Sequence, residues 1–90
     1  MKKAILEMTL RRKWFAEVAA GIKKTEYRKR KQYWKSRLEG RTYDVVRFRN
    51  GYAKKAPEVT VQFRGVRRQG KEYAIRLGKI LNIKRWMPQL

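Results

Sequence analysis

The second half of the chain alternates apolar and polar residues through three consecutive segments, and this pattern constrains the fold more than any other feature. A period of two is typical of strands with one face on a core and the other in solvent. The pattern predicts strands over residues 43–49, 58–66 and 73–83. Gly78 is expected to form a bulge, and Asn50-Gly51 and Gln69-Gly70 are turn signals. Consecutive strands with short connections pair in antiparallel fashion, so we expect an antiparallel sheet here.

The first half of the chain predicts two helices that alternate with two further strands. The expected elements are a strand at 4–8, a helix at 10–20, a strand at 23–28 and a helix at 29–38. Thr9 is placed to cap the first helix, and Gly21 and Gly40 to end the two helices. Helical spacing assigns three aromatic residues to the core, namely Trp14, Phe15 and Trp34. The order β-α-β-α-β-β-β predicts an α+β fold, a small and mostly antiparallel β-barrel of five to six strands with two short helices, because a curled sheet exposes less edge.

Length and residue types limit the function further. A chain of 90 residues predicts a single domain over residues 1–90. The chain has no Cys and no His. It therefore cannot form disulfides, cannot bind a metal through thiolate or imidazole, and cannot contain a Ser-His-Asp triad. Only seven Asp and Glu are present, so we expect no metal site and no cofactor. No apolar run is long enough to span a membrane, and the start of the chain does not resemble a signal peptide, so we expect a cytoplasmic protein with no membrane partner. We also expect a monomer.

The net charge is the strongest functional signal. The 26 Lys and Arg give the chain a formal charge of +19, and they are spread over the whole sequence. A field of this sign attracts polyanions, of which nucleic acid is the commonest partner. An anionic membrane surface or an acidic protein would also be attracted to a protein of this charge. Spread charge predicts a basic folded surface but does not locate a site.

Three segments resemble the ASCH domain family, whose members are small β-barrels of the PUA-like superfamily. The motif G-x-K-x-x-E-x-R is present as Gly21, Lys23, Glu26 and Arg28, after the expected first helix. The other two segments are YDVVRFRNGY at 43–52 and YAIRLGKIL at 73–81. The resemblance covers residues 4 to 82 and implies a PUA-like barrel that binds RNA or modified bases beside its first helix.

The same resemblance implies that hydrolysis is a second possibility. Some ASCH members are ribonucleases, and one branch removes the acetyl group from acetylcytidine with a Lys, a Thr three residues later and a distant Glu. Lys23 matches the first of these, whereas Glu26 occupies the Thr position and Thr25 lies one place earlier. Glu58 and Glu72 are candidates for the distant Glu.

Candidate site residues fall into three groups. Lys23, Glu26 and Arg28 come from the motif, and Glu26 and Arg28 share a face because they are two apart on a strand. Regular alternation sends Lys23 to the other face unless it precedes the strand. The second group can bind phosphate, read a base edge or stack on a base, and comprises Arg47, Arg49, Asn50, Tyr52 and Lys54. A third group of basic residues forms a possible phosphate-contacting rim, namely Arg30, Arg64, Arg67, Arg68 and Lys71.

Three functional hypotheses follow. The first is a nucleic-acid-binding domain, with RNA preferred, whose cleft is lined by Lys23, Glu26, Arg28, Arg49 and Tyr52. The second is a metal-independent ribonuclease or nucleoside amidohydrolase with Lys23 and Glu26 as catalytic residues. The third is an accessory factor that binds DNA or an acidic protein.

Overall fold

A computed structural model describes residues 3–87. Its elements in chain order are β1 (Ile5–Thr9), α1 (Arg12–Ala19), β2 (Thr25–Lys29), α2 (Gln32–Leu38), β3 (Val45–Arg49), β4 (Glu58–Gln69) and β5 (Glu72–Lys84). The order β-α-β-α-β-β-β is the predicted one. None of the helices described in residues 3–87 has the length and apolar character needed to cross a membrane.

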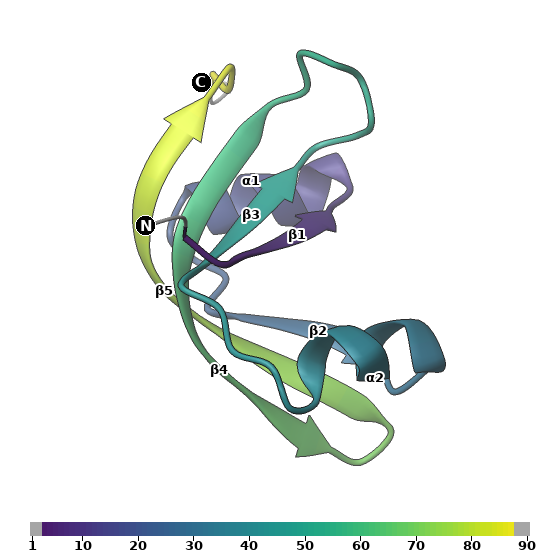
Figure 1. The fold of residues 1–90 in the computed structure, drawn as a ribbon. Coiled ribbons are helices and arrows are strands. Elements are labelled where there is room, and N and C mark those ends of the chain that lie inside the picture. Colours follow the sequence, from purple (N-terminus) through teal and green to yellow (C-terminus); the bar gives the residue numbers. More distant parts are fainter. Residues whose placement is uncertain (1–2, 88–90) are drawn as a thin grey trace.

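The five strands form one mixed sheet in the order β1-β3-β4-β5-β2. β1 and β3 are parallel, whereas β3–β4, β4–β5 and β5–β2 are antiparallel. Figure 1 shows the long strands β4 and β5 bent so that β1 and β3 lie above and β2 below. The predicted α+β class with two helices is confirmed, and the barrel takes the form of an open half-barrel. It stays open because β1 and β2 are the two edges of the sheet and do not pair with each other.

Bulges in the two long strands explain the curvature. The register shifts between Thr60 and Val61, between Val61 and Phe63, and between Phe63 and Val66. An extra residue makes a strand bend and twist more strongly, so a flat sheet becomes a half-barrel. The bulge predicted at Gly78 lies at the second of these shifts, and a Cβ atom there would be only 2.8 Å from the Gln62 side-chain oxygen. Any other residue at this position would force the Gln62 and Arg64 side chains to move, so glycine fits the bulge without rearrangement.

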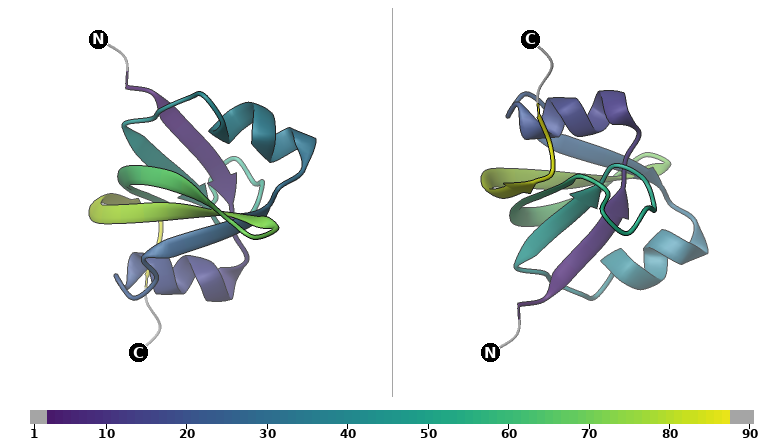
Figure 2. Two further views of the ribbon diagram at one scale, coloured as in Figure 1. Left: turned by 90° about the horizontal axis from the view of Figure 1, so that it is seen from below. Right: turned by 90° about the horizontal axis from the view of Figure 1, so that it is seen from above.

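The core lies on the concave face of the sheet. β1 contributes Leu6 and Met8, and β3 contributes Val46 and Phe48. The alternation predicted for β3 is confirmed, because Arg47 and Arg49 are less buried and lie on the other face. Figure 2 shows α1 and α2 at opposite sides of the curled sheet. Each helix buries a small apolar set against it, which consists of Phe15 and Val18 in α1 and Leu38 in α2.

Two of the predicted aromatic core positions differ from the structure. Phe15 is fully buried, as expected, but the Trp14 side chain is 42% exposed. Trp34 is partly buried and packs against the edge of the core. The buried stripe of α1 is centred on Phe15 and Val18, and Trp14 lies at its margin, where its indole stays partly in solvent.

Both helices begin later than predicted because extended backbone continues past each preceding strand. Thr9 belongs to β1 and does not cap α1, whose N-cap position is Arg11. The Leu10 backbone N–H instead donates to the Arg49 carbonyl at 2.8 Å, so the chain is still paired with β3 there. Likewise Lys29 pairs with Glu72 as the last residue of β2 and is not the start of α2.

Candidate nucleic-acid interface

The edge strand β2 places charged side chains on the face that the other strands fill with apolar ones. Glu26 lies opposite Ile75, and Arg28 lies opposite Tyr73, and both partners are core residues. The Glu26 residue is only 7% exposed and is the one charged residue among 3–87 in the buried class. A buried polar group is more informative than an exposed apolar one, because burial of a charge requires partners. Such departures from the binary pattern are expected at functional sites.

Glu26 is held by two cations. Arg28 donates to Glu26 Oε2 from Nη2 at 2.6 Å and from Nε at 3.0 Å. Lys23 Nζ lies 3.2 Å from the other oxygen, Oε1. Both carboxylate oxygens are therefore occupied, and we call Lys23, Glu26 and Arg28 the seam cluster.

Lys23 reaches Glu26 because it precedes the paired part of β2. Alternation along a strand would have separated the two side chains, but β2 begins only at Thr25. The Lys23 N–H donates to the Glu17 carbonyl of α1 at 3.1 Å, and Gly21 adopts a φ of 76° just before it. Only glycine takes this left-handed conformation without strain, so the glycine of the motif makes the turn that aims Lys23 at Glu26.

Arg28 also connects the two unpaired edges of the half-barrel. Its Nη2 atom donates to the Thr9 carbonyl, at the end of β1, at 3.3 Å. Since β1 and β2 share no backbone pairing, this side-chain bond spans the open seam between them. The seam cluster thus lies where the sheet opens.

Each cation of the seam cluster lies over an indole ring. Lys23 Nζ is 5.1 Å from the Trp14 ring centroid, and the Arg28 guanidinium carbon is 5.1 Å from that of Trp34. Cation–π attraction at this distance helps to fix both cations. The exposed Trp14 is therefore part of the candidate site. Helical spacing had predicted a core position for it.

The second predicted group lies on the other face of β3. Arg47 forms a 2.9 Å ion pair with Glu7, and its Nε is 3.7 Å from Glu58. The hydrogen bond with Arg47 lowers the pKa of the Glu7 carboxyl and raises that of the Arg47 guanidinium. Arg49 donates from Nη2 to the Ala53 carbonyl at 2.8 Å, and to that of Lys54 at 3.4 Å, which fixes the loop after β3.

The rest of this group divides between structure and solvent. The Asn50 side-chain amide donates to the Leu10 carbonyl at 3.1 Å and holds the turn to β1. Tyr52 is 87% exposed, and Lys54 is exposed beside it in the loop. The structure therefore assembles Lys23, Glu26 and Arg28 on the concave side, whereas Arg47 and Arg49 lie on the opposite face of the sheet.

The predicted rim is divided between two hollows. One, of about 650 Å³, includes Arg64 together with Lys24, Arg76 and Lys79. The other, of about 520 Å³, includes Arg30, Arg68 and Lys71. Arg67 is exposed on β4 and pairs with Ala74. Among residues 3–87, no group of three or more His, Cys, Asp or Glu side chains could hold a metal ion.

No protein-family model, curated protein or solved structure matches the chain. The resemblance to the ASCH family therefore stays a prediction from the three sequence segments. Besides the role of Trp14, two contacts of this region could not be predicted from the sequence. These are the hydrogen bond from Arg28 to the Thr9 carbonyl and the one from the hydroxyl of the buried Tyr73 to Glu39.

Proposed function

We propose that this protein binds nucleic acid, preferably single-stranded RNA, on the surface that joins the seam cluster to its neighbouring cations. One observation carries the proposal. Although the chain has 26 Lys and Arg, the salt bridges within residues 3–87 involve only Lys23, Arg28, Arg47 and Arg85. Most of the cations in this part of the chain have no carboxylate oxygen within 4 Å, and positive charge is in large excess, so the field extends into solvent, where it attracts a polyanion.

The seam cluster supplies what a uniform basic surface lacks. The Glu26 carboxylate holds Lys23 and Arg28 in fixed positions, and the N–H donors that these cations do not use on Glu26 can reach an acceptor on a base edge. Trp14 and Trp34 flank the cluster, and indole rings are stacking surfaces for unpaired bases. The preference for RNA rests on the resemblance of the G-x-K-x-x-E-x-R segment to the ASCH family.

The salt dependence of binding tests this function. If about five phosphates are neutralised, log K falls against log salt with a slope of roughly −3.5 for a single strand and −4.5 for a duplex. Fluorescence anisotropy with a labelled oligoribonucleotide at several salt concentrations measures the slope. Competition with duplex DNA then ranks the two nucleic acids. A flat slope, or no complex at low salt, contradicts the proposal.

The contact between Lys23 and Glu26 favours one second candidate, cleavage of the bound RNA. Lys23 would stabilise the negative charge that develops on the reacting group, and Glu26 would accept a proton. In this case Lys23→Ala and Glu26→Gln each abolish turnover, while Glu7→Gln retains it. Turnover that survives both changes assigns the activity to another source.

A further inference from the structure

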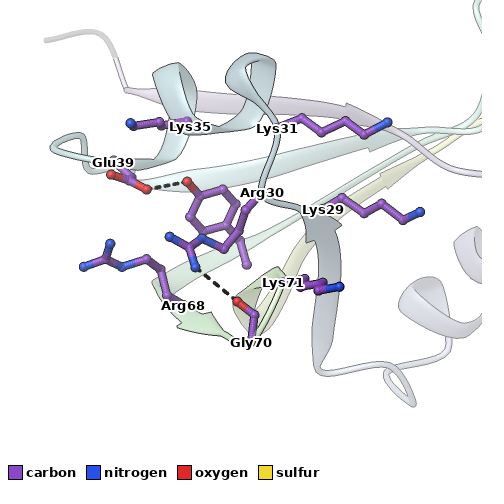
Figure 3. A pocket seen from close by; sticks show the side chains of 9 residues that line it. Lys29, Arg30, Lys31, Lys35, Glu39, Arg68, Gly70 and Lys71 are labelled. Carbon is purple, nitrogen blue, oxygen red and sulfur yellow. Dashed lines mark hydrogen bonds between the residues drawn. The ribbon is translucent and has the colours of Figure 1, made fainter.

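Six cations surround one open hollow at the far end of β2. The hollow has a volume of about 520 Å³ and lies between α2, with the residues that precede it, and the β4–β5 turn. We call its cations the basic pocket, which comprises Lys29, Arg30, Lys31, Lys35, Arg68 and Lys71. Figure 3 shows Arg30 at the centre, with Arg68 on one side and Lys29 and Lys71 on the other.

The charges of the basic pocket are not neutralised within the protein. Across residues 3–87, none of these six cations is within 4 Å of a carboxylate oxygen. Glu39 is the only acidic residue that lines the hollow, and it accepts a hydrogen bond from the Tyr73 hydroxyl. That bond lowers the pKa of the Glu39 carboxyl and raises the pKa of Tyr73. Glu39 keeps its negative charge and interacts with Arg68, Lys35 and Arg30. Six cations against this one carboxylate still leave an excess of five positive charges for an external anion.

Arg30 is fixed in place and still has free donors. Its Nη1 donates to the Gly70 carbonyl at 3.1 Å, and its guanidinium carbon lies 5.9 Å from the centroid of the buried Tyr73 ring. The Arg30 backbone N–H donates to the Lys71 carbonyl at 3.0 Å. A guanidinium has five N–H donors in a rigid fork, and the bond to Gly70 uses one of them, so others remain for an anion in the hollow that Arg30 lines.

The spread of the lysines favours a polymer over a small anion. In Figure 3 the ammonium groups of Lys31 and Lys35 point to opposite sides of the hollow. One small anion cannot contact both, whereas a chain of regularly spaced charges can. Arg forks and Lys ammonium groups are also the usual protein contacts of phosphate.

We propose that the basic pocket binds successive phosphodiester groups of the same RNA strand whose base lies at the seam cluster. This inference rests on the proposed function, and it adds the path that the bound RNA takes across the protein surface. Glu26 of the seam cluster and Arg30 of the basic pocket are four residues apart, which is on the order of 13 Å along extended chain, and this even spacing keeps them on one face. β2 therefore joins the base site to the backbone site, and the bound RNA runs along it for a few nucleotides.

The test compares two variants that lose the same charge. The pocket variant carries Lys29→Ala, Lys35→Ala and Lys71→Ala, and the control carries Lys3→Ala, Lys55→Ala and Lys84→Ala, three exposed positions outside both hollows. RNA affinity is measured across salt concentrations for both and for the unchanged protein. Thermal melts establish that both variants fold.

We expect the pocket variant to lose more than tenfold in affinity at low salt and its slope to become less negative by roughly 2, since each lost contact with a single strand removes about 0.7. The control changes the slope by less than half of that. Equal slopes for the two variants overturn the backbone site while leaving RNA binding in place. If the unchanged protein binds no RNA at all, both proposals fail. If polyaspartate displaces RNA as well as polyuridylate does, and only with the pocket intact, the pocket is a site for acidic protein and the inference is wrong.

Discussion

The seam cluster and the basic pocket lie next to each other along β2 and contain the same types of charged residue. In the seam cluster the cations are paired with a carboxylate, whereas in the basic pocket they are not. At the seam cluster, Lys23 and Arg28 share the buried carboxylate of Glu26. At the basic pocket, six cations surround a hollow whose single carboxylate is occupied by Tyr73. Paired charges fix the geometry of a site, and unpaired charges produce the field that brings a polyanion to it. Burial and pairing, and not the number of cations, therefore decide what a basic residue does in this protein.

The largest expected effect is the loss of folding stability when the buried carboxylate is neutralised. Glu26→Gln leaves Lys23 and Arg28 side by side without a counter-charge, and both are mostly shielded from solvent. We expect a decrease of roughly 2–3 kcal/mol in the free energy of unfolding, since removal of one partner of a buried ion pair is strongly destabilising. Urea denaturation followed by circular dichroism measures it.

Glu7→Gln is the matched control for that change. Glu7 also pairs with an arginine, Arg47, but its side chain is 56% exposed. Exposed ion pairs contribute about 0–1 kcal/mol, so the control is expected to lose less than 1 kcal/mol. Equal losses for Glu26→Gln and Glu7→Gln would show that burial does not distinguish the two pairs.

A smaller effect is expected when Arg28 is replaced by lysine. Arg28→Lys keeps the charge beside Glu26 but cannot make two bonds to it and a third to the Thr9 carbonyl. We expect a loss of about 1 kcal/mol in stability and faster amide hydrogen exchange in β1 and β2, because the seam is no longer bridged. Arg67→Lys, at an exposed position of β4, is expected to change neither quantity.

The next effect is confined to acidic pH. The hydrogen bond from Tyr73 lowers the pKa of Glu39 below its ordinary value of 4.5, so the folded state binds this proton less readily than the unfolded state. The stability from this bond is present above about pH 4.5 and is lost as pH falls through the folded-state pKa. Glu39→Gln removes this contribution, so its stability should fall less steeply below pH 4.5. Thermal melts at a series of pH values would contradict the assignment if the two curves were parallel.

The smallest expected effect on stability is at the basic pocket. Since its cations repel one another and have no carboxylate partners, removal of Lys29, Lys35 and Lys71 should change the free energy of unfolding by about 0–0.5 kcal/mol, with any change towards greater stability. Equilibrium unfolding in urea measures it at low salt, where repulsion is strongest. A marked loss of stability would mean that these lysines support the fold and do not serve a partner.

The strand pattern was accessible from the sequence because it depends on local alternation. Val46 and Phe48 face the core as predicted, and the bulge lies at Gly78. The parallel pairing of β1 with β3 was not predicted, because it depends on which edge of the sheet the first strand joins. The helix starts were misplaced for a related reason, since Leu10 and Lys29 follow the backbone pairing of their strands and not their helical propensity.

The candidate site was predicted in part. The motif spacing placed Glu26 and Arg28 on one face, and the turn at Gly21 brings Lys23 to them. Arg49, expected beside them, lies on the other face because alternation within β3 opposes it to Phe48. The role of Trp14 could not be predicted, since helical spacing alone does not tell a core indole from one that lies under a lysine.

The most direct measurement of the whole account is an NMR titration of the ¹⁵N-labelled chain with a short single-stranded RNA. The account predicts that RNA changes the amide chemical shifts most from Lys23 to Lys31, which includes β2 and the residues on either side of it. Large changes are also expected at Gly70 and Lys71 in the β4–β5 turn. Shifts confined to the loop after β3, with β2 and this turn unchanged, would contradict it.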